Sequence, residues 1–412
     1  MITRRNALAA LAAPAVLRGA RRRAGDKPNL LFLWTDQQRA DTFAAYGNTR
    51  YRMPALNRLA SECVVFDRAY VTQPVCTPSR SSVMTGLWPH TSGCVRNNIP
   101  LGKQTRTLPE LLADSAYRTG YMGKWHLGDE VFAQRGFQEW AAIEDGIYRP
   151  YFSEGRDPNA RSGYHHFLVH HGYKPDADGL FSRQFATKLP VDHSKPSYLA
   201  GEASRFILKH RNEPWALYVN FLEPHTPFSS ALNDLHSDDE AHLPANYPGV
   251  PEGTEPEWYR RRRANFLAGK GTGGFDLSAR AGFQRIARNY AGLCSLVDQA
   301  VGRILWALEA SGAAENTAIV FTSDHGEMMG SHSLITKQVM YEESVRVPYL
   351  LRAPFRKQKP HRVTNPVSHI DTIPTVLDLL GKKDCCEAQG RSLLADSAPR
   401  DVFIEWTGDG RE

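Results

Sequence analysis

The stretch Cys76-Thr-Pro-Ser-Arg80 places a thiol and a guanidinium at the expected start of a helix. Pro78 suits a first helical turn, where its missing N–H costs nothing, and the serines that follow can satisfy free backbone groups. Cys76 would then lie where unpaired N–H groups and the positive end of the helix dipole point. Such a position either holds an anion or favours ionisation of a thiol, and this stretch alone leaves both uses open.

A second set of polar residues follows apolar runs that are typical of buried strands. These residues are Asp36 after "NLLFLWT", His225 shortly after "WALYVNFL", and Asp324 and His325 after "NTAIVFTS". Taken singly, each aspartate is as well explained as a turn former or a helix cap. Taken together, the carboxylates and the imidazole are ligands that suit a divalent cation.

Two lysines complete the candidate chemistry. In "GYMGKWHLG", Lys124 and His126 are two residues apart and share one face if the segment is extended. Lys124 is either a surface lysine or a buried ammonium that faces an anion. Lys337 follows the Asp-His pair within reach of the same place, and prolines on both sides of His225 stiffen the loop that would aim it.

Strand-like and helix-like segments alternate along the chain, which predicts an α/β fold with a mostly parallel central sheet and helices on both faces. In such sheets, ligands bind beyond the carboxyl ends of the strands, where the polar residues above would converge. We expect one strand over 64–71, a helix over 107–117 and a long amphipathic helix over 283–311. Residues 130–200 and 229–280 are predicted to be substrate-facing loops.

Composition excludes several classes of protein. The formal charge is +6, but residues 1–25 hold six arginines and no acidic residue, so the rest of the chain is neutral and gives no case for nucleic-acid binding. No stretch predicts a stable membrane span. The six cysteines show no zinc spacing and are too few for a disulfide scaffold.

The N-terminus has the layout of an export signal. Arg4 and Arg5 precede a short apolar run, and small and basic residues follow, which favours the twin-arginine route. A basic tail with no export function is the alternative. We therefore expect a signal over 1–25 and an exported, periplasmic or extracellular protein.

The chain resembles the type I, formylglycine-dependent sulfatases of the alkaline-phosphatase-like superfamily. The resemblance covers residues 29–380 and depends on four segments that stand in the family's order: CTPSR at 76–80, GKWHLG at 123–128, PHTPF at 224–228 and SDHGE at 323–327. One of these segments alone would be modest support, whereas four in order make chance improbable.

The resemblance implies that a maturation enzyme oxidises Cys76 to formylglycine, whose hydrate attacks sulfur and later expels sulfate. It implies a divalent metal, Ca²⁺ or alternatively Mn²⁺, held by Asp36, Gln37, modified Cys76, Asp324 and His325. The expected catalytic residues are Arg80 at the diol, Lys124 and Lys337 on the sulfate oxygens, His126 in proton transfer at the diol, and His225 as the acid for the leaving alcohol.

The sequence departs from the family pattern in two places. Asp36 is followed by Gln37, where many sulfatases have a second aspartate, so the choice of metal is open. The chain also ends soon after "DVFIEW", which we expect to be the first strand of a small C-terminal antiparallel subdomain, truncated or reduced, over 383–412. The catalytic domain is expected over 26–382.

The sequence thus predicts a hydrolase that cleaves a sulfate monoester of a small molecule or saccharide. The alternative within the superfamily is a phosphodiesterase or phosphonate monoester hydrolase. A non-catalytic binding protein on a sulfatase fold is less favoured because Cys76, Arg80 and Lys124 are intact. A cysteine hydrolase without metal is less favoured because the metal-type ligands are clustered. The substrate itself is not specified by any motif.

Overall fold

The computed structural model describes residues 27–145, 151, 153–251, 253, 255–357, 359–382, 387–394 and 399–407. The expected export signal and the neighbouring pair Cys385 and Cys386 lie outside these residues. Cys63, Cys76, Cys94 and Cys294 are buried free thiols.

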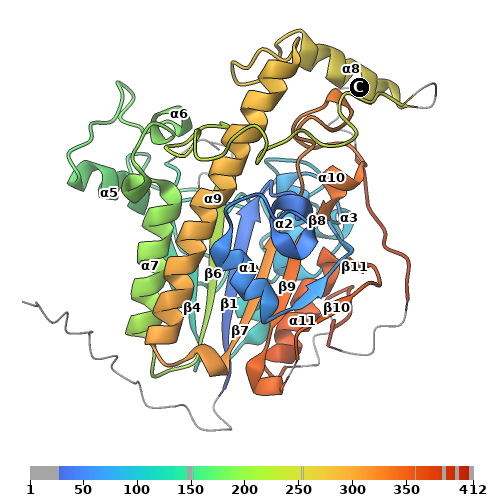
Figure 1. Cartoon of the computed structure of the whole chain (residues 1–412). Helices are drawn as coiled ribbons and strands as arrows, with labels where there is room; N and C mark the ends of the chain where they lie inside the picture. The colour runs from blue at the N-terminus through green and yellow to red at the C-terminus, as the bar shows by residue number, and fades with distance from the viewer. Residues whose placement is uncertain are drawn as a thin grey trace, which may run out of the picture.

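An eight-stranded sheet forms the centre of the described chain (Figure 1). In spatial order its strands are β10 (His361–Val363), β2 (Val64–Phe66), β9 (Tyr349–Arg352), β7 (Thr317–Ser323), β1 (Asn29–Asp36), β6 (Trp215–Pro224), β4 (Arg118–Gly123) and β5 (Glu139–Ala141). Only β9 runs antiparallel to its neighbours; the other pairs are parallel. The predicted mostly parallel sheet is confirmed.

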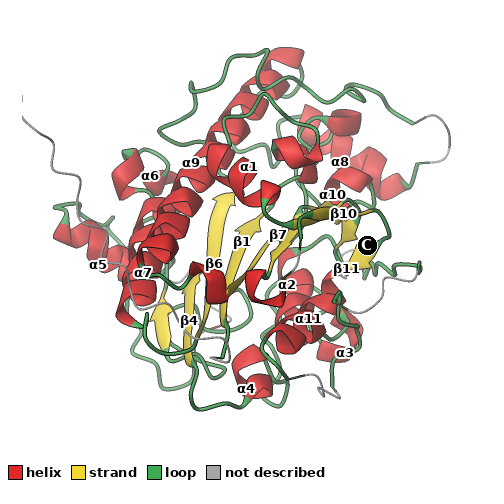
Figure 2. Ribbon diagram, turned by 60° about the horizontal axis from the view of Figure 1, so that its bottom comes forward, coloured by secondary structure: helices red, strands yellow, loops and turns green. Residues whose placement is uncertain are grey.

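Helices cover both faces of this sheet, as Figure 2 shows. Because side chains alternate along a strand, Leu31 and Leu33 of β1 enter one apolar core, and Leu30, Phe32 and Trp34 enter the other. The first core is closed by α1 (Pro54–Ser61), α5 (Gly163–His170), α7 (Lys195–Lys209) and α9 (Arg280–Ala310). The second is closed by α2 (Cys76–Thr85), α4 (Leu108–Leu112) and α11 (Thr372–Leu379).

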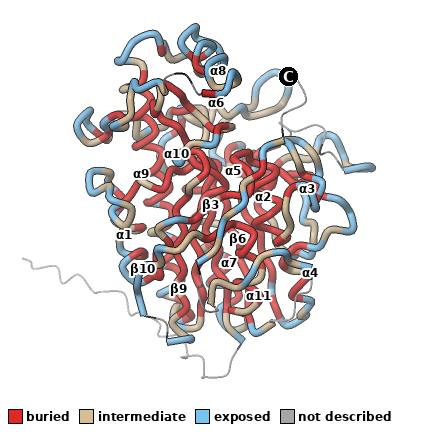
Figure 3. Tube along the Cα trace, turned by 90° about the vertical axis from the view of Figure 1, so that its right-hand side faces the viewer, coloured by how far each residue is buried: buried red, intermediate tan, exposed pale blue. Residues whose placement is uncertain are grey.

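Shorter elements surround this framework. The remaining helices are α3 (Pro89–Ser92), α6 (Arg183–Ala186), α8 (Glu257–Leu267) and α10 (Glu342–Val345). A second sheet joins β11 (Val367–Ser368), β3 (Ala69–Tyr70) and β8 (Arg346–Val347), with an antiparallel pair between β3 and β8. In Figure 3 the trace is buried through the sheet and its flanking helices and exposed mainly in the outer loops.

Helix α9 confirms the long amphipathic helix that the sequence predicts. Within the described residues it is the one helix that is long and apolar enough to cross a membrane, although the sequence analysis identified no such stretch. However, 78% of its apolar window is buried inside the protein. Its composition is therefore that of a core helix, packed against α7 and β6.

Five predictions of local secondary structure are wrong. The strand expected over 64–71 is two strands, because a turn at Asp67 and Arg68 sends β3 into the second sheet. The helix expected over 107–117 stops at Leu112, because Ala113 adopts a left-handed conformation with φ 45°. The loop expected over 130–200 contains β5, α5 and α6, because short apolar segments there pack onto the sheet and the first core. The loop expected over 229–280 contains α8. No strand forms over 401–406, where the described backbone joins its surroundings by one bond, from the Glu405 N–H to the Thr72 carbonyl, rather than by a ladder.

Candidate active site

The carboxyl ends of four neighbouring parallel strands deliver polar side chains to one edge of the sheet. Asp36 ends β1, Asp324 follows β7, Lys124 follows β4 and His225 follows β6. The approach of β4 to β6 is close: Gly123 has φ 114°, and a Cβ on it would lie 1.8 Å from the carbonyl oxygen of Asn220. A glycine before Lys124 therefore lets the lysine enter this edge.

Cys76 is the first residue of α2, as the sequence predicts. Val75 before it is extended, the Thr77 N–H donates to Asn97 Oδ1 at 3.0 Å, and Pro78 needs no partner for an N–H. All ten residues of α2 are buried. The helix therefore places Cys76 inside the protein, at the positive end of its dipole.

The Cys76 thiol has cationic neighbours. Its Sγ lies 3.1 Å from Lys337 Nζ, 3.3 Å from His325 Nε2 and 3.9 Å from Lys124 Nζ. Burial and the carboxylate of Asp36 raise the pKa of the thiol, but Lys124, Lys337 and His325 outweigh them and lower it to about 7. The same charges that ionise a thiol would hold an anionic substrate here.

Four side chains could hold a metal ion. One ligand atom from each of Asp36, Cys76, Asp324 and His325 lies within 4.8 Å of the others, and all four residues are buried. His325 Nδ1 is 2.9 Å from the carbonyl oxygen of Gly326, which can only accept, so Nδ1 carries the proton and Nε2 faces the group as a ligand atom. Two carboxylates, an imidazole and a further position suit a divalent cation.

Arg80 joins the two aspartates of this group. Its Nε donates to Asp324 Oδ2 and its Nη2 donates to Asp36 Oδ2, both at 2.9 Å, and the guanidinium is fully buried. Its Nη1 donates to Asn220 Oδ1 at 2.9 Å, and the guanidinium lies over the ring of Trp34. Arg80 therefore orients the candidate metal ligands, in addition to the role at the diol that the resemblance implies.

Gln37 is directed at Lys337. Its Oε1 accepts a hydrogen bond from Lys337 Nζ at 2.8 Å, and its Nε2 donates to Glu327. Each end of its amide thus makes one hydrogen bond, and the second lone pair of Oε1 leaves Gln37 a candidate metal ligand. Glu327 was not assigned a role from the sequence, although it lies in the SDHGE segment; burial raises the pKa of its carboxyl.

Lys124 and His126 do not share a face of an extended segment, because His126 has a left-handed backbone with φ 58°. Lys124 Nζ donates to Asp36 Oδ2 at 2.6 Å, whereas His126 Nε2 lies 3.0 Å from Asn98 Oδ1. The carboxylate of Glu130 accepts the N–H groups of Trp125 and His126 at 2.8 and 2.6 Å and so holds this bend. No sequence signal pointed to Glu130.

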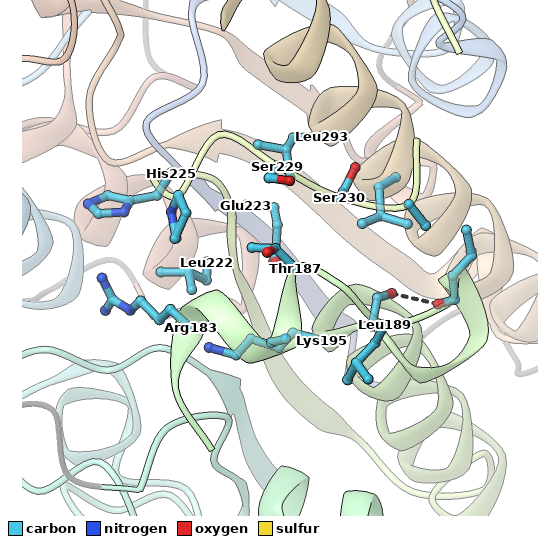
Figure 4. Close-up of a pocket in the computed structure, with 16 residues that line it drawn as sticks. Arg183, Thr187, Leu189, Lys195, Leu222, Glu223, His225, Ser229, Ser230 and Leu293 are labelled. Carbon is cyan, nitrogen blue, oxygen red and sulfur yellow. Dashed lines mark hydrogen bonds between the residues drawn. The ribbon is translucent and has the colours of Figure 1, made fainter. Parts of the chain in front are cut away.

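His225 lies on the loop after β6, beside a pocket that Figure 4 shows with Glu223, Arg183 and Lys195 around it. His225 Nδ1 is 2.7 Å from the Thr226 carbonyl oxygen, so it donates there and leaves Nε2 for a ligand. Burial and then Lys337 hold the pKa of His225 well below its usual range. The imidazole is thus neutral before an anion binds.

This edge of the sheet brings a candidate nucleophile, candidate metal ligands and anion-binding lysines together, as in hydrolases of the alkaline-phosphatase-like superfamily. A family model for sulfatases matches residues 28–382, so the chain belongs to the sulfatase family and is an enzyme of the class that hydrolyses sulfate esters.

Relatives and solved structures agree with this assignment. The chain is 29% identical to the uncharacterized sulfatase YidJ of Escherichia coli K12, over 92% of this chain and 73% of that protein. It is 28% identical to an N-acetylglucosamine-6-O-sulfatase of Bacteroides thetaiotaomicron, over 89% and 70%. The phosphonate monoester hydrolase of Silicibacter pomeroyi has a similar structure, with a TM-score of 0.73, 26% identity and coverage of 89% and 76%.

Asn220 is a site residue that the sequence analysis did not select, although it is a polar residue within an apolar strand. We expect Asn220→Ala to destabilise the protein by about 1–3 kcal/mol, because it leaves a buried N–H of Arg80 without its acceptor. Misorientation of the aspartates should also lower kcat/KM by on the order of 10²-fold. Urea unfolding and sulfatase kinetics measure the two effects.

The matched control is Asn29→Ala, at the opposite end of the same sheet, where the side chain bonds Thr317 and Trp215. This variant should lose comparable stability and retain its kinetics. Equal kinetic losses in both variants would contradict a specific role for Asn220.

Proposed function

We propose that this protein is a formylglycine-dependent sulfatase that hydrolyses a sulfate monoester of an alcohol such as a sugar. The observation that carries the proposal is the position of Cys76 at the start of a buried helix, with Lys337 Nζ at 3.1 Å and His325 Nε2 at 3.3 Å. The sulfate-ester hydrolases among its relatives support the reaction class.

The donor set around Cys76 fits a divalent cation. Asp36, Asp324 and His325 Nε2 would hold it together with residue 76, and hard carboxylate oxygens favour Ca²⁺ first and Mn²⁺ second. When bound, the cation supplies Lewis-acid polarisation of the sulfuryl group, and formylglycine, once formed, supplies a hydrated aldehyde as nucleophile.

The side chains of this chain supply the remaining steps. Lys124 and Lys337 bind the sulfate oxygens as point charges, and Arg80 keeps both aspartates in place. His225 Nε2 faces the leaving alcohol and passes it a proton. Because the bound sulfate is anionic, it raises the pKa of His225 and favours protonation of Nε2 when substrate is present. His126 assists proton transfer at residue 76.

A second candidate is a phosphonate monoester or phosphodiester hydrolase. The similarity to the phosphonate monoester hydrolase structure and the presence of Gln37 after Asp36 favour it. The crowding around residue 76 favours sulfate, because Arg80, Lys124 and Lys337 leave little room for a second organic group.

We predict a higher kcat/KM for an aryl sulfate than for the matched aryl phosphodiester, measured on protein coproduced with a formylglycine-generating maturation enzyme. Lys124→Ala and Lys337→Ala should each lower sulfatase kcat/KM by about 10²–10³-fold, as expected for loss of an anion-stabilising donor. A faster diester reaction would make the phosphoesterase the correct assignment.

The nucleophile is tested on the same preparations. Peptide mass spectrometry should find residue 76 as the aldehyde, and Cys76→Ser should stall after one turnover with sulfate on the serine, because serine lacks a second hydroxyl. Fully active protein that carries only the thiol would contradict the mechanism.

We predict that chelation abolishes activity and lowers Tm, and that Ca²⁺ or Mn²⁺ restores both, because an ion that binds only the folded state stabilises it. Asp324→Asn should lose this Tm response. Asp298→Asn, a buried aspartate that instead accepts the Ala55 and Leu56 N–H groups, is the matched control and should retain it. An unchanged rate in metal-free protein would show that the site holds no catalytic metal.

We propose that residues 1–25 direct export and are removed, so that the mature chain begins after the basic cluster Arg21–Arg23. N-terminal sequencing of exported protein tests the cleavage. Replacing Arg4 and Arg5 by lysine should retain the chain in the cytoplasm, because the charge stays but the arginine pair is lost. An intact Met1 on protein that stays in the cytoplasm would overturn the proposal.

A further inference from the structure

A pocket of about 370 Å³ opens beside the candidate nucleophile. Its walls include Gln73, Arg96, Asn97, Asn98, Gln338 and Trp406, and we call it the Arg96 pocket. Three residues of its wall adjoin residues of the reaction centre. Val75 precedes Cys76, Gln338 follows Lys337, and Asn98 contacts His126.

The other described pockets fit the leaving alcohol less well. The pocket beside His225 has about 20 Å³, which is room for a water molecule. A pocket of about 340 Å³ contains Glu315 and Arg352 and lies before the amino end of β7, away from the catalytic edge. The Arg96 pocket combines adjacency to residue 76 with the volume of a small-molecule site.

The amide groups of the Arg96 pocket suit hydroxyl groups. Gln73 is buried and supports the wall, because its Nε2 donates to the Val95 carbonyl oxygen at 3.1 Å and to Thr407 Oγ1 at 3.2 Å. Asn97 and Gln338 use their oxygens to accept from the Thr77 N–H and from Arg262. Within the described chain their NH2 groups remain available to donate to the oxygens of substrate hydroxyl groups.

Arg96 gives the pocket a positive charge. The described lining holds no acidic residue, and Arg96 is exposed with no ion pair or hydrogen bond to the part of the chain that the structure describes. Lys124 and Lys337 already serve the reacting sulfate. A guanidinium in this position matches a second carboxylate or sulfate group, which it can bind through two N–H donors.

Trp406 adds an aromatic face. Its neighbours fix it at the wall, because the Glu405 N–H donates to the Thr72 carbonyl at 2.7 Å and Thr407 Oγ1 donates to the Val95 carbonyl at 2.5 Å. Its side chain is 36% exposed although it is large and apolar. A partly exposed indole at the pocket wall is suited to cover the C–H face of a sugar ring.

We infer that the Arg96 pocket binds the leaving alcohol and selects a sugar that carries a second anionic group, which Arg96 binds while Trp406 covers the ring. This inference rests on the proposed function. It assigns substrate selection to a guanidinium, an indole and amide groups outside the metal and sulfate-binding residues.

The test compares kcat/KM for a monosaccharide with two sulfates or a sulfate and a carboxylate against the same sugar with one sulfate. We expect the wild type to prefer the doubly anionic sugar at least tenfold and Arg96→Gln to lower this preference by about tenfold. Arg303→Gln, an exposed arginine on α9 without a partner within the described chain, is the matched control and should keep the preference. An unchanged preference in Arg96→Gln would overturn the inference.

Binding provides a second readout that does not depend on turnover. Calorimetry with the desulfated sugar that keeps its second anionic group should show at least tenfold weaker binding to Arg96→Gln and to Trp406→Ala, but not to Trp306→Ala, whose side chain is 68% exposed on α9. Equal binding by all variants would overturn the inference. Failure of the wild type to hydrolyse any sulfate monoester would instead overturn the proposed function.

Discussion

The buried guanidinium of Arg80 between Asp36 and Asp324 is the interaction on which the site depends. It joins α2 to the ends of β1 and β7, and through Asn220 it reaches β6. Removal of one partner from such a buried pair typically costs 3–5 kcal/mol, because the remaining charge is left without compensation. The helix that carries the candidate nucleophile and the candidate metal ligands are therefore joined by one side chain, four residues along the helix from Cys76.

The charge balance of the site follows from this arrangement. Three buried or nearly buried cations, Arg80, Lys124 and Lys337, face two carboxylates, Asp36 and Asp324. The excess positive charge lies where little water is present to screen it, so it favours an anionic substrate strongly. The positive end of the α2 dipole acts in the same direction. A sulfate monoester, with a single negative charge, matches this excess, and a divalent cation would increase it.

Much of the site could be predicted from local patterns. A residue that directly follows a buried strand lies at the carboxyl edge of the sheet, and neighbouring parallel strands bring such residues together. Asp36, Lys124, His225 and Asp324 come together for this reason. Asn220 and Glu130 could not be predicted in this way. Asn220 accepts a hydrogen bond from Arg80, which is distant in sequence, and Glu130 accepts from N–H groups that reach it only because the backbone bends at His126. Gln37 is predicted as a metal ligand, and the structure adds contacts of its amide with Lys337 and Glu327 that no local pattern indicates.

The sequence by itself determined the alternation of strands and helices, the helix start at Cys76 and the membership in the sulfatase family, because each is encoded in short segments and their order. Only the tertiary structure decided where the strand over 64–71 divides, how His126 turns away from Lys124, and which residues form the Arg96 pocket. The bend at His126 is held by the buried carboxylate of Glu130, and the pocket joins segments hundreds of residues apart, such as Val75, Gln338 and Trp406. The conformational preferences of short segments do not specify such contacts, because the residues that meet are determined by how the whole chain packs.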